Sequence, residues 1–310
     1  MSDLVLISGS AHVEMAEKIA EHLQQPLLDV ELGRFSDGEI QIQIRENLRG
    51  TDVFIIQPTL PPADNIMELL LMLDAVKRAS CRRVTAVIPY FGYGRQDRKD
   101  QPRVPIGARL MADLITQAGA NRVLTIDLHA PQIQGFFSIP LDHLYSAPVL
   151  LRYFGDADRS NMAVVAPDVG SIKMTRSFAK RLGCSLSIID KRRPEANKAE
   201  IMNFIGDVKG KDVVIFDDMI DTAGTISQAA DVCVQEGAIS VTTCATHPIF
   251  SGRALERLNR ESIRDVIVSN TIPFHRHAEC PKVKVLDMSG LLAEAILRIH
   301  EEKTVSKLFM

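Results

Sequence analysis

Short apolar runs rich in β-branched residues alternate with amphipathic stretches along the whole of this 310-residue chain. The runs have the length of buried strands, and the stretches between them carry apolar residues at helical spacing. This alternation is typical of parallel sheets with helices on both faces, because a parallel strand reaches its neighbour through a helical crossover. The sequence therefore predicts an α/β fold with mostly parallel sheets flanked by helices.

Nine runs are predicted strands, and four stretches are predicted helices. The strands are residues 4–8, 52–58, 83–91, 122–129, 162–168, 186–190, 212–218, 240–248 and 265–269. The helices are residues 65–79, 106–119, 171–183 and 225–237. A strand, a polar loop and a helix follow one another at 88–114 and again at 214–232, which indicates two related halves. Strand periodicity is lost at 141–158, so we expect one domain over 1–145 and a second over 146–310.

Composition is ordinary for a soluble globular protein. The formal net charge of −3, with 24% charged and 46% hydrophobic residues, gives no support to a nucleic-acid or membrane partner. No window reaches 18 apolar residues, and the amino terminus lacks a cationic segment before an apolar one. The five cysteines are odd in number and show no CxxC pairing, which is typical of reduced thiols. We expect a soluble, cytoplasmic protein.

Residues 213–226, VVIFDDMIDTAGTI, place three acids directly before a small loop that opens a helix. Ligands of open α/β sheets lie at the carboxyl ends of strands, and backbone N–H groups at a helix N-terminus bind phosphate. Asp217 and Asp221 are suited to accept hydrogen bonds from sugar hydroxyls, whereas Asp218 serves either structure or a hydrated Mg²⁺. The stretch therefore predicts a sugar phosphate site. An ordinary helix N-cap at Asp221-Thr222 is the alternative.

Two further loops carry polar residues with more than one interpretation. Asp127 and His129 end a predicted strand two residues apart, and hence on one face, where they suit a metal or phosphate site. A strand-end histidine can equally be a hydrogen-bonded core residue. The turn GRFSDGE at 33–39 is, from composition alone, a solvated turn.

Two basic loops are also open to two interpretations. Residues 92–105, GYGRQDRKDQPRVP, contain four cationic side chains: Arg95, Arg98, Lys99 and Arg103. Such a cluster suits a triphosphate, because a guanidinium group binds two phosphate oxygens at once. A solvated surface run fits them too. Residues 188–202, IIDKRRPEANKAEIM, carry a basic triplet that also suits a solvated turn.

Two of these segments carry a family resemblance. VVIFDDMIDTAGT resembles the phosphoribosyl-diphosphate-binding signature of type I phosphoribosyltransferases, and DLHAPQIQGFFSIPLD at 127–142 resembles the signature of ribose-phosphate diphosphokinases. The similarity continues through RENLRG at 45–50, THPIFSG at 246–252 and SGLLAEAILRI at 289–299. The chain thus resembles a class I, bacterial-type ribose-phosphate diphosphokinase, which implies two phosphoribosyltransferase-like domains, the first with the ATP site and the second with the ribose 5-phosphate site.

The resemblance implies a role for each site residue. The implied ATP-binding residues are Phe35, which would stack on the base, with Asp37, Gly38, Glu39, Arg95 and Gln96. The implied ribose 5-phosphate residues are Arg193, Asp217, Asp221, Thr222, Ala223, Gly224 and Thr225. Lys191 and Arg193 would be catalytic residues on a mobile flap that excludes water, and His129 and Asp168 would contact Mg²⁺.

The implied reaction transfers the β,γ-diphosphoryl group of ATP to the C1 hydroxyl of ribose 5-phosphate, giving phosphoribosyl diphosphate and AMP for nucleotide biosynthesis. Mg²⁺ is the implied cofactor, and a homo-oligomer, a hexamer in related enzymes, is the implied assembly. A phosphoribosyltransferase is one alternative, although it leaves FSDGE, RQDRK and KRRP without a task. A catalytically silent partner subunit is another, although such proteins interrupt the flap and KRRPEANKAEIM has no insertion.

The sequence departs from the family pattern at 166–180, APDVGSIKMTRSFAK. Ser171 stands where a second glycine is usual, and Met174 where an arginine is common. Serine adopts positive φ less readily than glycine, so we expect altered loop geometry beside Asp168. Gly94 replaces a usual alanine, and Glu195 reduces the positive charge of the flap.

Overall fold

The computed structural model describes residues 3–155, 159–192 and 201–309. The chain forms two compact units. The first unit comprises residues 1–145, 271–273 and 288–310, and the second comprises residues 146–270 and 274–287. The first unit therefore includes the helix near the end of the chain.

The first unit is built on a five-stranded parallel sheet with the order β1-β4-β5-β6-β7. Its strands are β1 (Leu4–Ser8), β4 (Asp52–Ile56), β5 (Arg83–Ile88), β6 (Arg122–Ile126) and β7 (Leu141–Leu144). β4 is buried throughout and β5 is buried except at Arg83, as expected of parallel strands covered on both faces. A separate antiparallel hairpin consists of β2 (Val30–Arg34) and β3 (Ile40–Ile44).

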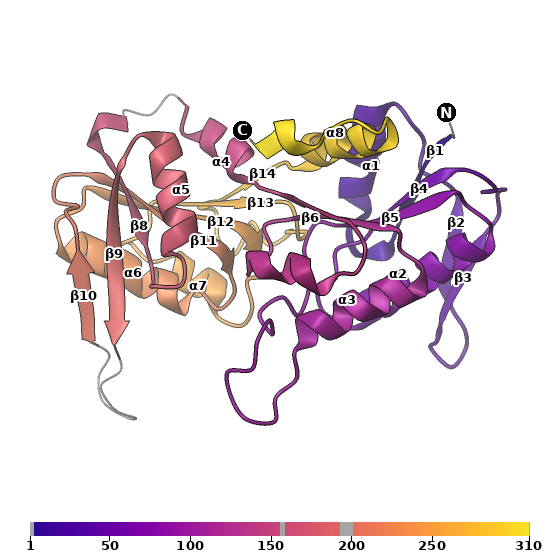
Figure 1. The fold of residues 1–310 in the computed structure, drawn as a ribbon. Helices are drawn as coiled ribbons and strands as arrows, with labels where there is room; N and C mark the ends of the chain where they lie inside the picture. Colours follow the sequence, from indigo (N-terminus) through magenta and orange to yellow (C-terminus); the bar gives the residue numbers. More distant parts are fainter. Residues whose placement is uncertain (1–2, 156–158, 193–200, 310) are drawn as a thin grey trace. The chain divides into compact units, whose positions relative to one another are not determined.

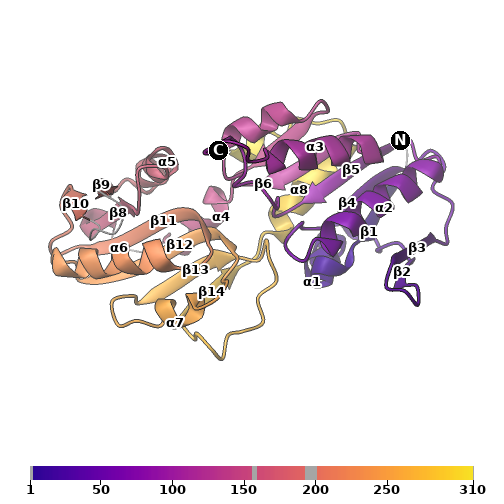
Figure 2. The same ribbon diagram turned by 90° about the horizontal axis from the view of Figure 1, so that it is seen from below.

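Helices cover both faces of this sheet (Figures 1 and 2). They are η1 (Ser10–His12), α1 (Val13–Leu23), α2 (Asp64–Arg78), α3 (Gly107–Ala118), η2 (Pro131–Phe136), α8 (Ser289–His300) and η4 (Ser306–Phe309). The apolar stripes of α2 and α3 pack on one face and contribute to the core of the unit. α1 and α8, which are far apart in sequence, pack against each other on the opposite face.

The second unit contains a seven-stranded sheet with the order β10-β9-β8-β11-β12-β13-β14. Its strands are β8 (Met162–Ala166), β9 (Ser185–Arg192), β10 (Ile201–Ile205), β11 (Asp212–Ile220), β12 (Ser240–Pro248), β13 (Asp265–Ser269) and β14 (Val283–Leu286). All neighbours are parallel except β10, which pairs antiparallel with β9.

Helices also flank the second sheet. They are α4 (Ala147–Tyr153), η3 (Arg159–Asn161), α5 (Ile172–Leu182), α6 (Gly224–Gln235) and α7 (Ala254–Leu258). α6 and α7 supply much of the core on one face. On the other face Phe178 of α5 stacks on Phe216 of β11, with ring centroids 4.1 Å apart. The large apolar surface buried in both units fixes the strand ends, and hence the loops, in place.

All nine predicted strands and all four predicted helices are present, and the predicted α/β fold class is confirmed. The expected loss of strand character at 141–158 is wrong only for its first four residues, which form β7, and the helix α4 follows. Only four residues long, β7 is too short to give a clear apolar alternation. No helix in the described part of the chain is long and apolar enough to cross a membrane.

Candidate active site

The predicted phosphate loop connects β11 to α6 in the second unit. β11 ends at Ile220, and Ala223 adopts a left-handed backbone, with φ 58° and ψ 12°, directly before the first helical residue, Gly224. Non-glycine residues adopt this conformation rarely, and such strain concentrates at functional sites. The N-cap residue Ala223 makes no side-chain hydrogen bond to the first N–H groups of α6, and N–H groups at a helix N-terminus attract anions.

Three carboxylates gather beside this loop. Asp217 and Asp218 lie on β11, and Asp168 follows β8, the neighbouring parallel strand. Burial raises the pKa of the Asp217 carboxyl well above its ordinary value, and the Asp218 and Asp168 charges raise it further. The backbone N–H of Asp218 donates to Oδ1 of Asp217 at 2.9 Å and opposes the shift in part. This concentration of negative charge favours a cation or several hydroxyl donors as the neighbouring group.

The turn after β8 does not need the glycine that Ser171 replaces. Ser171 has φ −83° and ψ −8°, in the right-handed region, so its backbone carries no strain from a positive φ, and the expected change of loop geometry stays a prediction. Instead, the Ser171 N–H donates to Oδ1 of Asp168 at 2.9 Å, and its hydroxyl donates to the Asp168 carbonyl at 3.0 Å. Ser171 therefore orients Asp168.

Of the two predicted catalytic residues, the structure describes the backbone position of Lys191. Lys191 is the penultimate residue of β9, where it is paired with Met202 of β10. Arg193 lies outside the described residues. The structure thus gives Lys191 a position on a strand, whereas residues 193–200 of the predicted flap lie outside the described residues.

In the first unit, the predicted base-binding turn joins β2 to β3. The backbone N–H of Phe35 donates to the Glu39 carbonyl at 2.9 Å, and Gly38 occupies the left-handed region with φ 94°. The Asp37 carboxylate accepts the N–H of Glu39 at 3.1 Å. The Phe35 side chain is 52% exposed, which leaves an aromatic face open to a planar ligand.

The loop after β5 and the loop after β6 meet in the first unit. A Cβ atom at Gly94 would lie 3.8 Å from Cβ of His129, so the turn that carries Arg95 and Gln96 is next to His129. The Gln96 carbonyl accepts the N–H of Ala108 at 3.1 Å, which ties this loop to the start of α3. The structure therefore brings together three predicted residues: Arg95, Gln96 and His129.

The geometry predicted for Asp127 and His129 is wrong. β6 ends at Ile126, and Asp127 has a left-handed φ of 37°, so the strand alternation that would place both side chains on one face is broken. Asp127 is buried, whereas His129 is exposed. His129 alone of the pair remains a candidate for the site.

Two residues that sequence reasoning did not assign contact the phosphate loop. The Ser251 hydroxyl donates to Oδ1 of Asp221, and Nη1 of Arg257 donates to the Thr222 carbonyl at 2.8 Å. Both follow β12, the strand next to β11. Their position after a neighbouring parallel strand was the available signal, because such loops converge at the same edge of a sheet.

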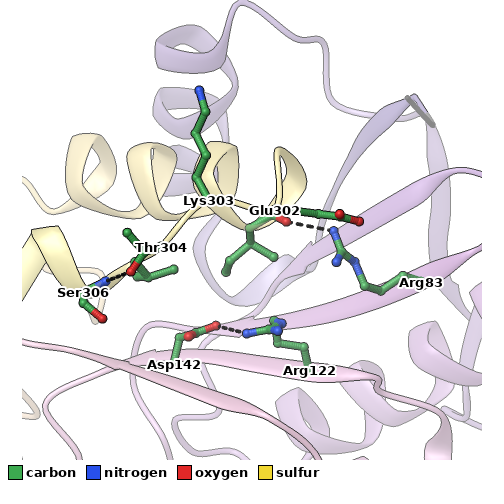
Figure 3. Close-up of a pocket in the computed structure, with 9 residues that line it drawn as sticks. Arg83, Arg122, Asp142, Glu302, Lys303, Thr304 and Ser306 are labelled. Atoms are coloured by element: carbon green, nitrogen blue, oxygen red, sulfur yellow. Dashed lines mark hydrogen bonds and ion pairs between the residues drawn. The ribbon is translucent and has the colours of Figure 1, made fainter.

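A cavity of about 500 Å³ lies elsewhere in the first unit (Figure 3). It is at the amino ends of β5, β6 and β7, the opposite edge from the loops just described. Arg122 and Asp142 form an ion pair of 2.6 Å in it, and Nη2 of Arg83 donates to the Ile299 carbonyl at 3.0 Å. Because these cations already have protein partners, the cavity is not the predicted triphosphate site.

The described residues contain no group of three or more histidines, cysteines, aspartates or glutamates that could hold a metal ion on its own. All five cysteines are free thiols, and burial raises the pKa of Cys233 to about 12. A cysteine with so high a pKa is a poor nucleophile at neutral pH. The chemistry available to the site is therefore that of carboxylates, cations and backbone N–H groups.

These features define an α/β protein of the class that binds phosphorylated ligands at the carboxyl edge of parallel sheets. Comparison of the sequence with models of protein families identifies the family within this class. The model for the N-terminal domain of ribose phosphate pyrophosphokinase matches residues 4–119, and that for the phosphoribosyl synthetase-associated domain matches residues 191–310.

Relatives match over almost the full length. A ribose-phosphate pyrophosphokinase of Chlorobaculum tepidum is 54% identical, covering 98% of this chain and 94% of the relative. One from Caldanaerobacter subterraneus subsp. tengcongensis is 53% identical, with coverage of 99% and 98%. A crystal structure of phosphoribosylpyrophosphate synthetase from Mycobacterium smegmatis superposes with a TM-score of 0.92 at 39% identity, covering 97% of this chain and all of that one. The chain belongs to the ribose-phosphate pyrophosphokinase family.

Proposed function

We propose that this enzyme transfers the β,γ-diphosphoryl group of ATP to the C1 hydroxyl of ribose 5-phosphate, giving phosphoribosyl diphosphate and AMP. Family membership, with near-complete coverage of relatives at about half identity, supports the reaction. The observation that carries the proposal for this chain is the position of the α6 N-terminus, whose N-cap residue Ala223 provides no side-chain hydrogen bond, directly after the acids of β11. There the loop Thr222–Thr225 binds the 5-phosphate, and Asp217 and Asp221 accept hydrogen bonds from ribose hydroxyls.

The adenine nucleotide is assigned to the first unit. Phe35 stacks on the base, because its exposed ring lies on a turn that is fixed by backbone hydrogen bonds. Asp37, Gly38 and Glu39 accompany it on the same turn. Arg95 and Gln96 bind the phosphates from the loop after β5, and the position of that loop beside His129 supports a shared site.

Mg²⁺ fits the residues proposed for it, although the described side chains alone do not enclose a metal. Mg²⁺ is commonly bound through one or two carboxylates together with substrate phosphates and water. Asp168 provides a carboxylate in the second unit, and its charge adds to that of Asp217 and Asp218. His129 is the proposed contact in the first unit. When bound, Mg²⁺ neutralises charge on the ATP oxygens.

The chain's own residues have the remaining tasks. The C1 oxygen forms a bond to the β-phosphorus as the bond from that phosphorus to the α,β-bridging oxygen breaks. The bridging oxygen leaves with AMP, and the proton of the C1 hydroxyl passes to water. Lys191 and Arg193 stabilise the charge that develops on the transferring group and on the departing AMP. The segment that carries them excludes water, which competes with the sugar hydroxyl as the nucleophile.

Assembly and location complete the proposal. The resemblance to homo-oligomeric family members supports a homo-oligomer, for which a hexamer is the proposed state. Five free thiols are in keeping with a reducing, cytoplasmic compartment. Analytical ultracentrifugation tests the assembly, since a monomer at micromolar concentration would contradict it.

Phosphorus NMR tests the reaction. The purified protein is incubated with ATP, Mg²⁺ and ribose 5-phosphate, and the expected result is that AMP and a C1-linked diphosphate appear together in equal amounts. A silent partner subunit would give neither product. A phosphoribosyltransferase would instead consume added phosphoribosyl diphosphate and a nucleobase, and that result would contradict the proposal.

A further inference from the structure

The segment that follows β12 holds the phosphate loop through its backbone. The N–H of Phe250 donates to the Ile220 carbonyl, and the N–H of Ser251 donates to the Asp221 carbonyl, each at 3.0 Å. Phe250 has a left-handed φ of 50°, a conformation that lets two successive N–H groups turn toward one neighbouring chain. The carbonyls of Ile220 and Asp221 therefore both point toward the segment that follows β12.

Arg257 holds the next carbonyl with its side chain. Its Nη1 donates to the Thr222 carbonyl at 2.8 Å. Across a planar trans peptide the carbonyl and the following N–H point in opposite directions, so the N–H of Ala223 faces away from Arg257. The left-handed backbone at Ala223 then leads into α6. Arg257 thus fixes the direction of the last peptide before the helix N-terminus.

The charge of Arg257 is also close to the loop. Its Nη1 lies 3.5 Å from the position that a Cβ of Gly224 would occupy. Within the described residues Arg257 forms no ion pair with a carboxylate. The carboxylate of its neighbour Glu256 instead accepts two hydrogen bonds from Arg253. Nε of Arg253 lies 2.6 Å from Oε2, and Nη2 lies 2.5 Å from Oε1. The positive charge is therefore well placed to attract a dianion at the helix N-terminus.

We infer that Arg257 is a positioning residue for the sugar phosphate, which it serves by orienting the loop Thr222–Thr225 and by placing a positive charge beside it. This inference rests on the proposed assignment of the 5-phosphate to that loop. A carbonyl left without Arg257 is free to rotate toward the phosphate, where its dipole repels the anion. The planar guanidinium matters as well as the charge, because lysine cannot hold the same fixed geometry.

The test compares Arg257→Gln and Arg257→Lys with the control Arg253→Gln. Arg253 lies on the same segment, is exposed, and binds only Glu256 among the described residues. KM for ribose 5-phosphate, KM for ATP and kcat are measured for each variant. Calorimetry measures ribose 5-phosphate binding without ATP, and circular dichroism checks the fold.

Arg257→Gln is expected to raise both KM and Kd for ribose 5-phosphate about 10- to 100-fold, the usual effect of losing a charged hydrogen-bonding group. KM for ATP is expected to change less than about twofold. Arg257→Lys restores part of the affinity because it keeps the charge, and Arg253→Gln behaves as the wild type. This selectivity for one substrate is a result that a merely structural role does not produce.

An unchanged affinity for ribose 5-phosphate in folded Arg257→Gln would overturn the inference. Equal losses for both substrates, accompanied by a lower Tm, would also overturn it in favour of a structural role. Wild-type protein that yields no AMP and no phosphoribosyl diphosphate would instead contradict the proposed function. The calorimetric comparison still decides the role of Arg257 in that case, because it needs no turnover.

Discussion

The backbone N–H of Asp218 donates to Oδ1 of Asp217 at 2.9 Å, so the two acids are in direct contact through a bond that favours the ionised form of Asp217. This bond lowers the pKa of Asp217, but the effects that raise the pKa are larger. Burial and the Asp218 and Asp168 charges raise the pKa of Asp217 well above its ordinary value. The site is therefore assembled at a cost to the fold, as is common where function requires close like charges.

Asp217→Asn should stabilise the unliganded protein at neutral pH. A raised pKa means that the folded chain binds more protons than the unfolded chain between the ordinary pKa and the raised one, so stability falls as pH rises through that window. Asparagine removes this loss. We expect almost no difference in the free energy of unfolding below about pH 4 and a growing advantage of the variant above it.

Urea unfolding of both proteins in metal-free buffer, across a series of pH values, measures this difference. The amide oxygen of asparagine can still accept the Asp218 N–H, so that bond is not a complication. A variant that is less stable than the wild type at neutral pH, or a difference that does not depend on pH, would refute the assignment of the charge cluster.

Gly224→Ala should fold normally and bind ribose 5-phosphate poorly. Among the described residues, a Cβ at Gly224 meets only Arg257 and Thr222, at 3.5 and 3.7 Å, and both distances are ordinary contacts. The residue also begins a helix, so no described neighbour requires glycine there. The stability is expected to stay the same or rise by up to about 1 kcal/mol. If the phosphate approaches the backbone here, the methyl group raises KM for ribose 5-phosphate about tenfold or more.

Steady-state kinetics and thermal unfolding of Gly224→Ala check both parts. An unaltered KM for the sugar in a stable variant would show that the phosphate does not approach this backbone. A large loss of stability would show that the glycine has a structural task.

Lys191→Ala should lower kcat about 10³-fold or more and leave KM for ATP almost unchanged, because a charge-stabilising side chain in a phosphoryl-transfer enzyme acts mainly in the transition state. Lys180→Ala, at an exposed position near the end of α5, is the matched control and should be neutral. Stopped assays of AMP formation at saturating substrates measure the effect. A kcat near the wild-type value would remove Lys191 from the catalytic residues.

Ser171→Gly, which restores the residue usual in the family, should cost about 1 kcal/mol of stability and change kcat little. The variant loses the hydroxyl bond to the Asp168 carbonyl but keeps the backbone N–H bond to the Asp168 carboxylate. Chemical unfolding and kcat are the measurements. A kcat that rises or falls tenfold would show that serine alters the geometry of Asp168 after all.

The sequence predicted the long buried strands because β4, β5, β8 and β11 are continuous apolar runs, and no partner is needed to recognise them. It did not predict β2 or β3, whose burial is partial and whose pairing decides their conformation. The association of α8 with α1 was also beyond local patterns. The two helices come from opposite ends of the chain and meet only in the folded unit. The same holds for the contact of His300, at the end of α8, with Asp52 of β4, where Nδ1 lies 3.0 Å from Oδ2.

The candidate site was predictable only in part for the same reason. The loop at 222–225 was recognisable because its composition and its place after a strand are local features. The contribution of Arg257 was not, because only the pairing of β11 with β12 brings it to that loop. The left-handed backbone of Asp127 likewise depends on tertiary structure, and it reversed a prediction that assumed regular strand geometry.

The most direct test of the account is to measure KM for ribose 5-phosphate in the variant Asp217→Asn. The control is Asp231→Asn on α6, where the Asp231 carboxylate forms an ion pair of 2.6 Å with Arg260. The account predicts that Asp217→Asn raises KM for the sugar about tenfold or more, with KM for ATP within about twofold of the wild type. An unaltered KM for ribose 5-phosphate would contradict the claim that the acids before the loop bind the ribose.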